Sequence, residues 1–479
     1  MKRQCTALAL AVLMASAAHA ADVVELDLAT VVAMALERNA ALKAEEERRH
    51  EVAGGVEEAG ADAWPQVDVI THWNRSRSPS LLNSPDFEEF VEQFPGFTPG
   101  EQELYTVGVE VSQPIYSGGK VRAALDLAEL VVDITDSQID AVRLDTALSA
   151  TEAWYRLQAA RASLRTVTSQ QEARRESLQV VQDRFDLGEA TRLELLRAEA
   201  ALAEVGPTAA EAEGRVVVEA ARLRALLGLE SEVEIRGQST TDTDVPQVPT
   251  RDELIHRAFE TRPELRDLLL QEDALHRQRT VAAAESKPQV ELNGEYGRQV
   301  RLLENLDDDL FQNWSVSVSL SWNVFDGGRV AGQVAQIDSQ KAQLQWRREE
   351  LRRQIVADVE QSLAALRTAV ESERASVVSA AAATEAARVA AETYRQGVAL
   401  QADLLDAQDR AISAELEATQ ARLERQIQWA RLKRAIGRLP TDSLEAATHD
   451  PETARGSAAP DEFPSESTMS ISIPPSPGR

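Results

Sequence analysis

Strict alternation of apolar and polar residues marks one segment of the chain as a β-strand. From Trp314 to Trp322 every second residue is apolar, and a serine stands at each position between them. Successive side chains of a strand point to opposite faces, so this strand has one apolar face and one serine face. Its length is about that of a tilted strand that crosses a lipid bilayer.

Three further segments alternate in the same way, though less regularly. Their apolar positions are Val67, Val69 and Trp73; Tyr105, Val107, Val109 and Val111; and Val290, Leu292 and Tyr296. Aromatic residues lie near the strand ends, as they do in the girdles of membrane barrels. A two-sided sheet in a soluble domain is the alternative interpretation. The membrane interpretation is favoured, because long helices flank all four strands and leave no obvious partner for the apolar faces.

The remaining pattern has a helical period. Residues 120–186 contain neither proline nor glycine, and apolar or small residues recur there at spacings of three and four. This spacing is typical of coiled coils. Residues 330–396 form a matching stretch, in which Lys341 and Arg348 interrupt the apolar seam. A helix of about 68 residues is about 100 Å long, far longer than a compact domain needs.

Shorter helices are predicted on both sides of each long one. Turns at Gly188 and Gly397 lead into helices of about 40 residues, and single helices are predicted over 27–62 and 251–285. Two short helices laid end to end nearly equal one long helix in length. Each long helix is therefore expected to pair with two stacked short ones. Gly206-Pro207 is expected to kink or interrupt the short helix of the first half.

The same elements occur twice along the chain. Pro65-Gln66-Val67 recurs as Pro288-Gln289-Val290, and Gly188 recurs as Gly397. The sequence therefore predicts an internal duplication. The expected divisions are a signal peptide (1–20), a first structural repeat (21–235), a linker (236–250), a second structural repeat (251–440) and a disordered tail (441–479).

The first residues indicate export from the cytoplasm. Lys2 and Arg3 precede an apolar run, and Ala18-His19-Ala20 fits the cleavage rule of signal peptides. The single cysteine, Cys5, lies in this segment, so the mature chain is expected to contain no disulfide. No later segment has about 18 consecutive apolar residues, the length of a transmembrane helix.

Composition narrows the possible partners and chemistry. The formal net charge is −28, which argues against nucleic acid as a partner, because phosphate binding needs a basic surface. The histidines show no metal-ligand spacing, and the motifs of hydrolases, metalloproteases and phosphate-binding loops are missing. The sequence therefore predicts no enzyme activity, cofactor or metal site.

Four strands cannot close a membrane barrel, since the smallest barrels have about eight. An open sheet edge in lipid leaves unpaired backbone groups at a cost of several kcal/mol each. Several subunits must therefore contribute strands to one barrel. Two copies would give a barrel filled by side chains, and three would give a wider bore. The residues alone leave the number of copies open.

These features together resemble the TolC-like outer-membrane efflux proteins. The resemblance rests on the repeated Pro-Gln-Val, on the glycine pairs at 118–119 and 327–328, and on the turn segments 185–196 and 394–407. It implies a mixed α and β membrane protein of the outer membrane. In such a protein three subunits share a 12-stranded barrel, which a periplasmic coiled-coil tube continues. The implied function is an exit duct of a tripartite efflux or type I secretion system.

The resemblance also implies partners and site residues. The homotrimer would contact outer-membrane lipid, a periplasmic adaptor protein and, through it, an inner-membrane pump. Asp403 and Asp406 match acidic residues of the periplasmic pore gate; the alternative is that both are solvated helix carboxylates. Gly188 and Gly397 mark the turns where an adaptor would make contact. Some family members have an arginine at the position of Ala399, so a latch here must use other residues.

A periplasmic coiled-coil spacer with a soluble β-domain is the competing hypothesis. A duct should fractionate with outer membranes and need detergent, whereas a spacer should dissolve in buffer. The cargo, whether drug, metal or protein, cannot be inferred from these residues.

Overall fold

A computed structural model describes residues 23–77, 101–230, 234–237, 248–301 and 309–442. The chain divides into a compact unit that ends at Thr441 and a C-terminal segment, Asp442–Arg479. The predicted signal peptide and nearly all of the predicted tail lie outside the described residues. None of the described helices combines the length and the hydrophobicity that a membrane-spanning helix requires.

Four strands form one antiparallel sheet, which confirms the predicted strands. They are β2 (Gln66–Arg77), β3 (Glu101–Tyr116), β5 (Gln289–Val300) and β6 (Gln312–Ser321), in the order β2-β3-β5-β6. A short 3-10 helix, η4 (Asp309–Phe311), precedes β6. The central pair β3–β5 joins the two halves of the chain. Among the described strands, β2 and β6 each have one neighbour only, so each leaves an edge of the sheet open.

Two helices of 67 residues extend from this sheet. They are α5 (Lys120–Asp186) and α9 (Arg329–Arg395), and each follows a glycine pair. The shorter helices are α2 (Leu28–Arg38), α3 (Ala40–Ala61), α6 (Arg192–Leu227), α7 (Arg251–Thr261), α8 (Pro263–Ala284) and α10 (Gln401–Ala435). Pro207 lies inside α6 without interrupting it.

Each predicted opening helix is in fact two helices, so the prediction of single helices was wrong. The break falls at Asn39 in the first half and at Arg262 in the second, where the backbone is extended (ψ 122° and 121°). Asn39 ends α2 and caps α3, accepting hydrogen bonds from the backbone N–H groups of Ala41 and Leu42. Arg262 precedes Pro263, which disfavours a helical conformation in the residue before it.

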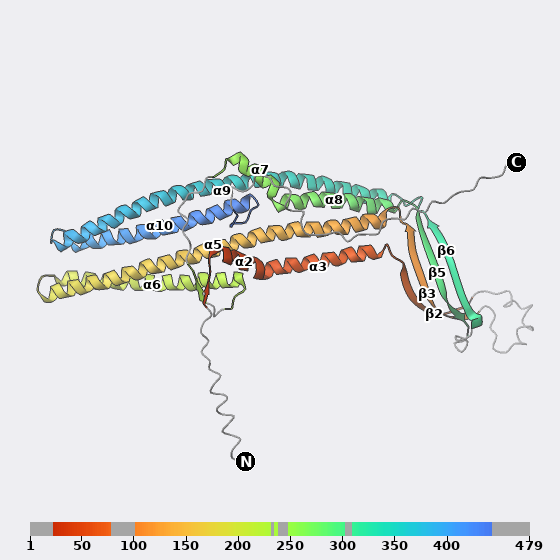
Figure 1. Ribbon diagram of the computed structural model, residues 1–479, viewed down its shortest axis with the longest axis horizontal. Coiled ribbons are helices and arrows are strands. Elements are labelled where there is room, and N and C mark those ends of the chain that lie inside the picture. The colour runs from red at the N-terminus through yellow and green to blue at the C-terminus, as the bar shows by residue number, and fades with distance from the viewer. Residues whose placement is uncertain (1–22, 78–100, 231–233, 238–247, 302–308, 443–479) are drawn as a thin grey trace, which may run out of the picture. The chain divides into compact units, whose positions relative to one another are not determined.

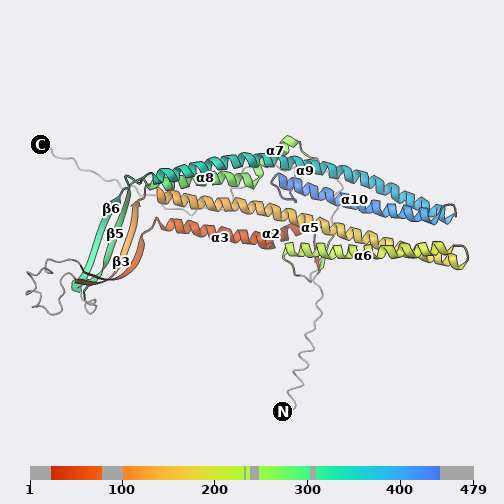
Figure 2. The same cartoon turned by 180° about the vertical axis from the view of Figure 1, so that it is seen from behind.

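The helices pack side by side in the order of the strands (Figures 1 and 2). Helices α3 and α6 pack on one side of α5, α8 and α10 pack between α5 and α9, and α9 comes last. The end of α6 meets the break between α2 and α3, because a Cβ on Gly228 would lie 3.2 Å from the Arg38 carbonyl oxygen. Gly437 meets Thr261 in the same way. Each long helix thus pairs with stacked short helices, as predicted.

A buried cluster holds the two halves together near the middle of α5. Trp154 and Leu157 of α5 are fully buried there, together with Leu223 of α6, and Ile427 of α10 closes the cluster. Beside it, β1 (Val23–Glu25) pairs in parallel with β4 (Glu234–Arg236). This small sheet was not predicted. The strand β4 ends at the first residue of the predicted linker.

Candidate functional site

One face of the four-stranded sheet is apolar and exposed. The register aligns Val69, Val109, Tyr296 and Trp314 across the four strands, one residue from each. Val69 is 78% exposed and Trp314 is 70% exposed. Exposed apolar side chains that form a continuous face mark a surface that contacts another apolar phase or another molecule.

The opposite face of the sheet is polar. Asp68, Glu110, Glu295 and Ser315 stand opposite one another across the four strands. Facing carboxylates destabilise a sheet unless water or cations screen them. This face is therefore suited to an aqueous space.

Aromatic residues lie at both ends of the apolar face. At the end near the helices, Trp322 follows β6 and donates its indole N–H to the Ser286 carbonyl oxygen at 3.0 Å. At the far end, Trp73 donates to the Glu103 carboxylate at 3.0 Å. A Trp ring with an apolar body and a satisfied polar tip is typical of the boundary between lipid and water.

The predicted turns at Gly188 and Gly397 have the same geometry. Both glycines have positive φ (77° and 76°). The N–H of Glu189 donates to the Arg184 carbonyl at 2.8 Å, and Val398 donates to Thr393 at 3.0 Å. This is the Schellman arrangement, in which the left-handed residue is usually glycine. Each turn therefore needs its glycine for backbone reasons alone.

Apolar side chains crowd the two turns. Leu187 is 75% exposed, Val398 is 79% exposed and Leu400 is 71% exposed. Hydrophobic residues that large and that exposed offer a surface for a protein partner.

Asp403 and Asp406 both lie in the first turns of α10 and are exposed. The Asp403 carboxylate accepts a hydrogen bond from the backbone N–H of Leu400 at 3.3 Å. Glu194 does the same at the start of α6, where it accepts from the N–H of Thr191 at 2.6 Å. That backbone hydrogen bond lowers the pKa of Glu194. Asp403 thus takes part in helix capping, a role that the sequence analysis did not identify.

Polar contacts that sequence reasoning missed join the hairpins α5–α6 and α9–α10. Arg184 donates to the Tyr394 hydroxyl at 3.1 Å, close to the turns. Farther from the turns along α5, Arg174 is only 4% exposed and forms an ion pair with Asp409 of α10. The partners are more than 200 positions apart, so no local pattern pairs them.

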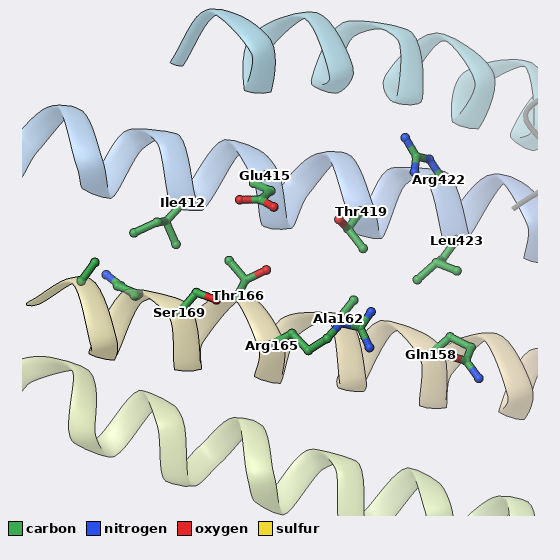
Figure 3. A pocket seen from close by; sticks show the side chains of 12 residues that line it. Gln158, Ala162, Arg165, Thr166, Ser169, Ile412, Glu415, Thr419, Arg422 and Leu423 are labelled. Carbon is green, nitrogen blue, oxygen red and sulfur yellow. The ribbon is translucent and has the colours of Figure 1, made fainter. Parts of the chain in front are cut away.

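A polar groove separates α5 from α10 between the buried cluster and Arg174. Figure 3 shows side chains from both helices facing each other across it. Its volume is about 670 Å³. Arg165 and Thr166 line it from α5, and Glu415 and Arg422 line it from α10. The two helices are therefore in contact at the two ends of the groove, at the buried cluster and at Arg174, rather than along their whole length.

The part of the chain that the structure describes contains no group of three or more His, Cys, Asp or Glu residues arranged to hold a metal ion.

The sequence matches the family profile described as "Outer membrane efflux protein" over residues 31–229 and 254–438. Comparison with curated proteins gives no sequence match.

Solved structures with the same fold are distant in sequence. A membrane protein from Pseudomonas aeruginosa is 22% identical, with a TM-score of 0.72 over 86% of this chain and 93% of that one. The outer membrane protein VceC from Vibrio cholerae is 18% identical, with a TM-score of 0.69 over 86% and 96%. The CmeC outer membrane channel of Campylobacter jejuni is 17% identical, with a TM-score of 0.69 over 87% of each chain.

Proposed function

We propose that this chain, which belongs to the outer membrane efflux protein family, is the exit duct of a tripartite efflux or type I secretion system. In that role it receives cargo from an inner-membrane pump and a periplasmic adaptor and releases it outside the cell. The family is one of transport proteins rather than enzymes. The protein accordingly resides in the outer membrane and has a large periplasmic portion.

The observation that carries the proposal is the four-stranded sheet with one apolar face, one polar face and two open edges. An apolar face suits lipid, and the row of Asp68, Glu110 and Glu295 suits a water-filled bore. Both edge strands need a partner in lipid, because no water is available there to bond their backbone groups. The β6 edge of one copy can pair with the β2 edge of the next. Three copies would close a barrel of twelve strands.

The helices support the same assembly. Helix α5 has neighbours on two sides, whereas α9 packs against α7, α8 and α10. Within the described residues no extensive contact joins α9 to α3 or α6. A ring of copies supplies that contact, with α9 of one copy against α3 and α6 of the next. Strands and helices follow the same order across the chain. The same rotation from one copy to the next therefore closes both the strand barrel and the ring of helices.

The turns at Gly188 and Gly397 are the proposed adaptor contacts. They are the ends of the two hairpins, about 100 Å along α5 and α9 from the sheet. The exposed side chains of Leu187, Val398 and Leu400 offer an apolar surface at these turns. An adaptor with an apolar tip would bury this surface.

Asp403 and Asp406 are the proposed pore gate. In a ring of three copies each would contribute three like charges, which repel one another and attract cations. The Asp403 carboxylate also accepts a hydrogen bond from the N–H of Leu400.

Conductance in planar lipid bilayers tests the duct and its gate together. The purified protein should form discrete channels, and Asp403→Ala should lower the preference for cations. Glu385→Ala is a suitable control, because Glu385 is a solvated carboxylate paired with Arg388 on α9. If the protein is recovered as a detergent-stable oligomer but forms no channels, the proposal that it is an exit duct is contradicted. Unchanged selectivity in Asp403→Ala removes this residue from the gate.

A further inference from the structure

The positive charges of the sheet lie at one end of one face. Strand β2 contains Arg75 and Arg77, β5 contains Arg298, and no other residue of β2, β3, β5 and β6 is an arginine or lysine. Because side chains alternate between the faces, Arg75 and Arg77 share the face of Val69, and Arg298 shares the face of Tyr296. All three arginines therefore belong to the apolar face, at the end of the sheet that is farther from the helices.

Polar and aromatic side chains are mixed at this end. The register aligns Arg75 with Glu103. The Glu103 carboxylate accepts hydrogen bonds from the Trp73 indole at 3.0 Å and from the Tyr105 hydroxyl at 2.9 Å. Such a mixture of charged and aromatic side chains is typical of the level at which lipid tails give way to headgroups.

Arg298 lies just beyond the aromatic boundary of the apolar face. The register places it beside Val107 and Gln312. The neighbouring row toward the helices contains Tyr296 and Trp314, about 7 Å along the strands. The Tyr296 hydroxyl accepts a hydrogen bond from the Gln312 side-chain amide. The polar tip of the tyrosine thus reaches the row of Arg298, which is the first polar row beyond the apolar face.

This depth in the bilayer is suited to a guanidinium that binds an anion. The cost of an arginine on the lipid-facing side of a membrane strand is high at the bilayer midplane and falls toward the interface. Lipid phosphates lie at the interface, and a guanidinium can donate two parallel hydrogen bonds to one phosphate group. Arg298 therefore stands where its own cost is low and where a complementary anion is within reach.

The orientation of the sheet identifies the leaflet. The long helices begin at the other end of the strands, at Lys120 and Arg329, and they form the periplasmic portion. The end that carries Arg298 consequently meets the outer leaflet. The characteristic lipids of that leaflet are glycolipids with phosphate groups on their sugars, whereas phospholipids form the periplasmic leaflet.

We propose that Arg298 and Gln312 form a binding site for the phosphate group of an outer-leaflet glycolipid. The Arg298 guanidinium donates to two phosphate oxygens. The Gln312 amide nitrogen carries two N–H groups, of which one donates to Tyr296 and the other is directed at the glycolipid headgroup. The acyl chains of the same lipid lie along the apolar face, over Tyr296 and Trp314. This inference rests on the proposed function, because it requires the sheet to be in the outer membrane.

Native mass spectrometry of the detergent-purified oligomer measures the binding. The probes are lipid A, a glycolipid with two phosphates, and its dephosphorylated form with the same acyl chains. The parent protein should bind lipid A about tenfold more tightly than the dephosphorylated form, the ratio expected for one charged hydrogen-bonded contact. Arg298→Gln should remove this preference, and Arg298→Lys should retain part of it. Equal binding of the two glycolipids by the parent protein overturns the site.

Exchanging two neighbouring residues provides a matched control. Arg298→Gln with Gln299→Arg keeps the composition, the net charge and the depth of the guanidinium, but moves it to the polar face of the sheet. This double variant should bind lipid A as weakly as Arg298→Gln does. If it binds lipid A as tightly as the parent protein, the attraction does not depend on the face, and the proposed site is refuted.

Two further probes distinguish the source of the phosphate. Phosphatidylglycerol should bind less tightly than lipid A, and millimolar inorganic phosphate should not displace lipid A. The reverse of either result overturns the assignment to a glycolipid. All of these failures leave the duct intact when the same preparation forms channels. A parent protein that is a monomer in buffer without detergent would instead refute the proposed function.

Discussion

The two long helices have the same length but very different surroundings. Helices α5 and α9 each contain 67 residues and each begin at a left-handed glycine. Eighteen residues of α5 are buried, against nine of α9. The difference follows from position, because α5 lies between other helices and α9 lies at an edge. Within the described residues, α9 is therefore packed by fewer helices than α5.

Removing the central anchor of α5 should have the largest effect. Trp154 is fully buried in the cluster that joins the two halves, so Trp154→Ala should lower the free energy of unfolding by about 3–5 kcal/mol. Thermal unfolding followed by circular dichroism in detergent measures this. A variant as stable as the parent would show that the cluster does not hold the two halves together.

Removing an exposed tryptophan of α9 should act on association instead. Trp346 is 73% exposed, so Trp346→Ala should leave helix content unchanged and weaken the oligomer by about 2 kcal/mol per interface. Mass photometry at decreasing protein concentration measures this, with Trp346→Phe as the control that retains an aromatic ring. If Trp346→Ala dissociates no more readily than the control, the ring of Trp346 does not lie at the interface.

Breaking one ion pair of α5 should have a smaller effect. Arg174→Ala should cost about 1–3 kcal/mol, because the Arg174 side chain is 4% exposed and loses its charged hydrogen bond to the half-exposed Asp409. Amide hydrogen exchange should rise near Asp409 of α10. Arg388→Ala removes an exposed pair with Glu385 and should have a smaller effect, because water and salt screen that pair. If the two variants lower the free energy of unfolding equally, burial of Arg174 does not strengthen its ion pair.

Acid should loosen the start of α6 slightly. The pKa of Glu194 is lowered by the N–H of Thr191, so the carboxylate stabilises the fold above its unfolded pKa. This stabilisation is lost as the pH falls from about 4.5 through the folded pKa. Glu194→Gln should remove that pH dependence and change stability only slightly at neutral pH, because water screens the exposed carboxylate. If amide hydrogen exchange of α6 rises with acid equally in the parent protein and in Glu194→Gln, the stabilising role of the Glu194 carboxylate is contradicted.

Local patterns predicted much of the fold. Alternation from Trp314 onward identified β6, and the glycines at 188 and 397 marked the turns, since both signals act over a few residues. The break at Arg262 carried a local signal as well, the following Pro263. The helical period continued across this break and hid it.

Long-range contacts could not be predicted in this way. The β1–β4 pair joins segments about 210 positions apart, and each strand has three residues only. In the sequence, Arg174 and Asp409 are charged residues of predicted helices, and such residues are expected on a solvated helix surface as much as in an ion pair between helices. Only the packed helices bring them together. For the same reason the gate role of Asp403 stays a prediction, whereas its hydrogen bond to Leu400 is seen directly.

Electron cryomicroscopy of the detergent-purified protein tests the central claim most directly, because one map gives the number of copies and the neighbours of α9. The account predicts three copies with a closed barrel of twelve strands, and α9 of each copy against α3 and α6 of the next. A monomer whose sheet folds in water, with Val69 and Trp314 facing solvent, would contradict it.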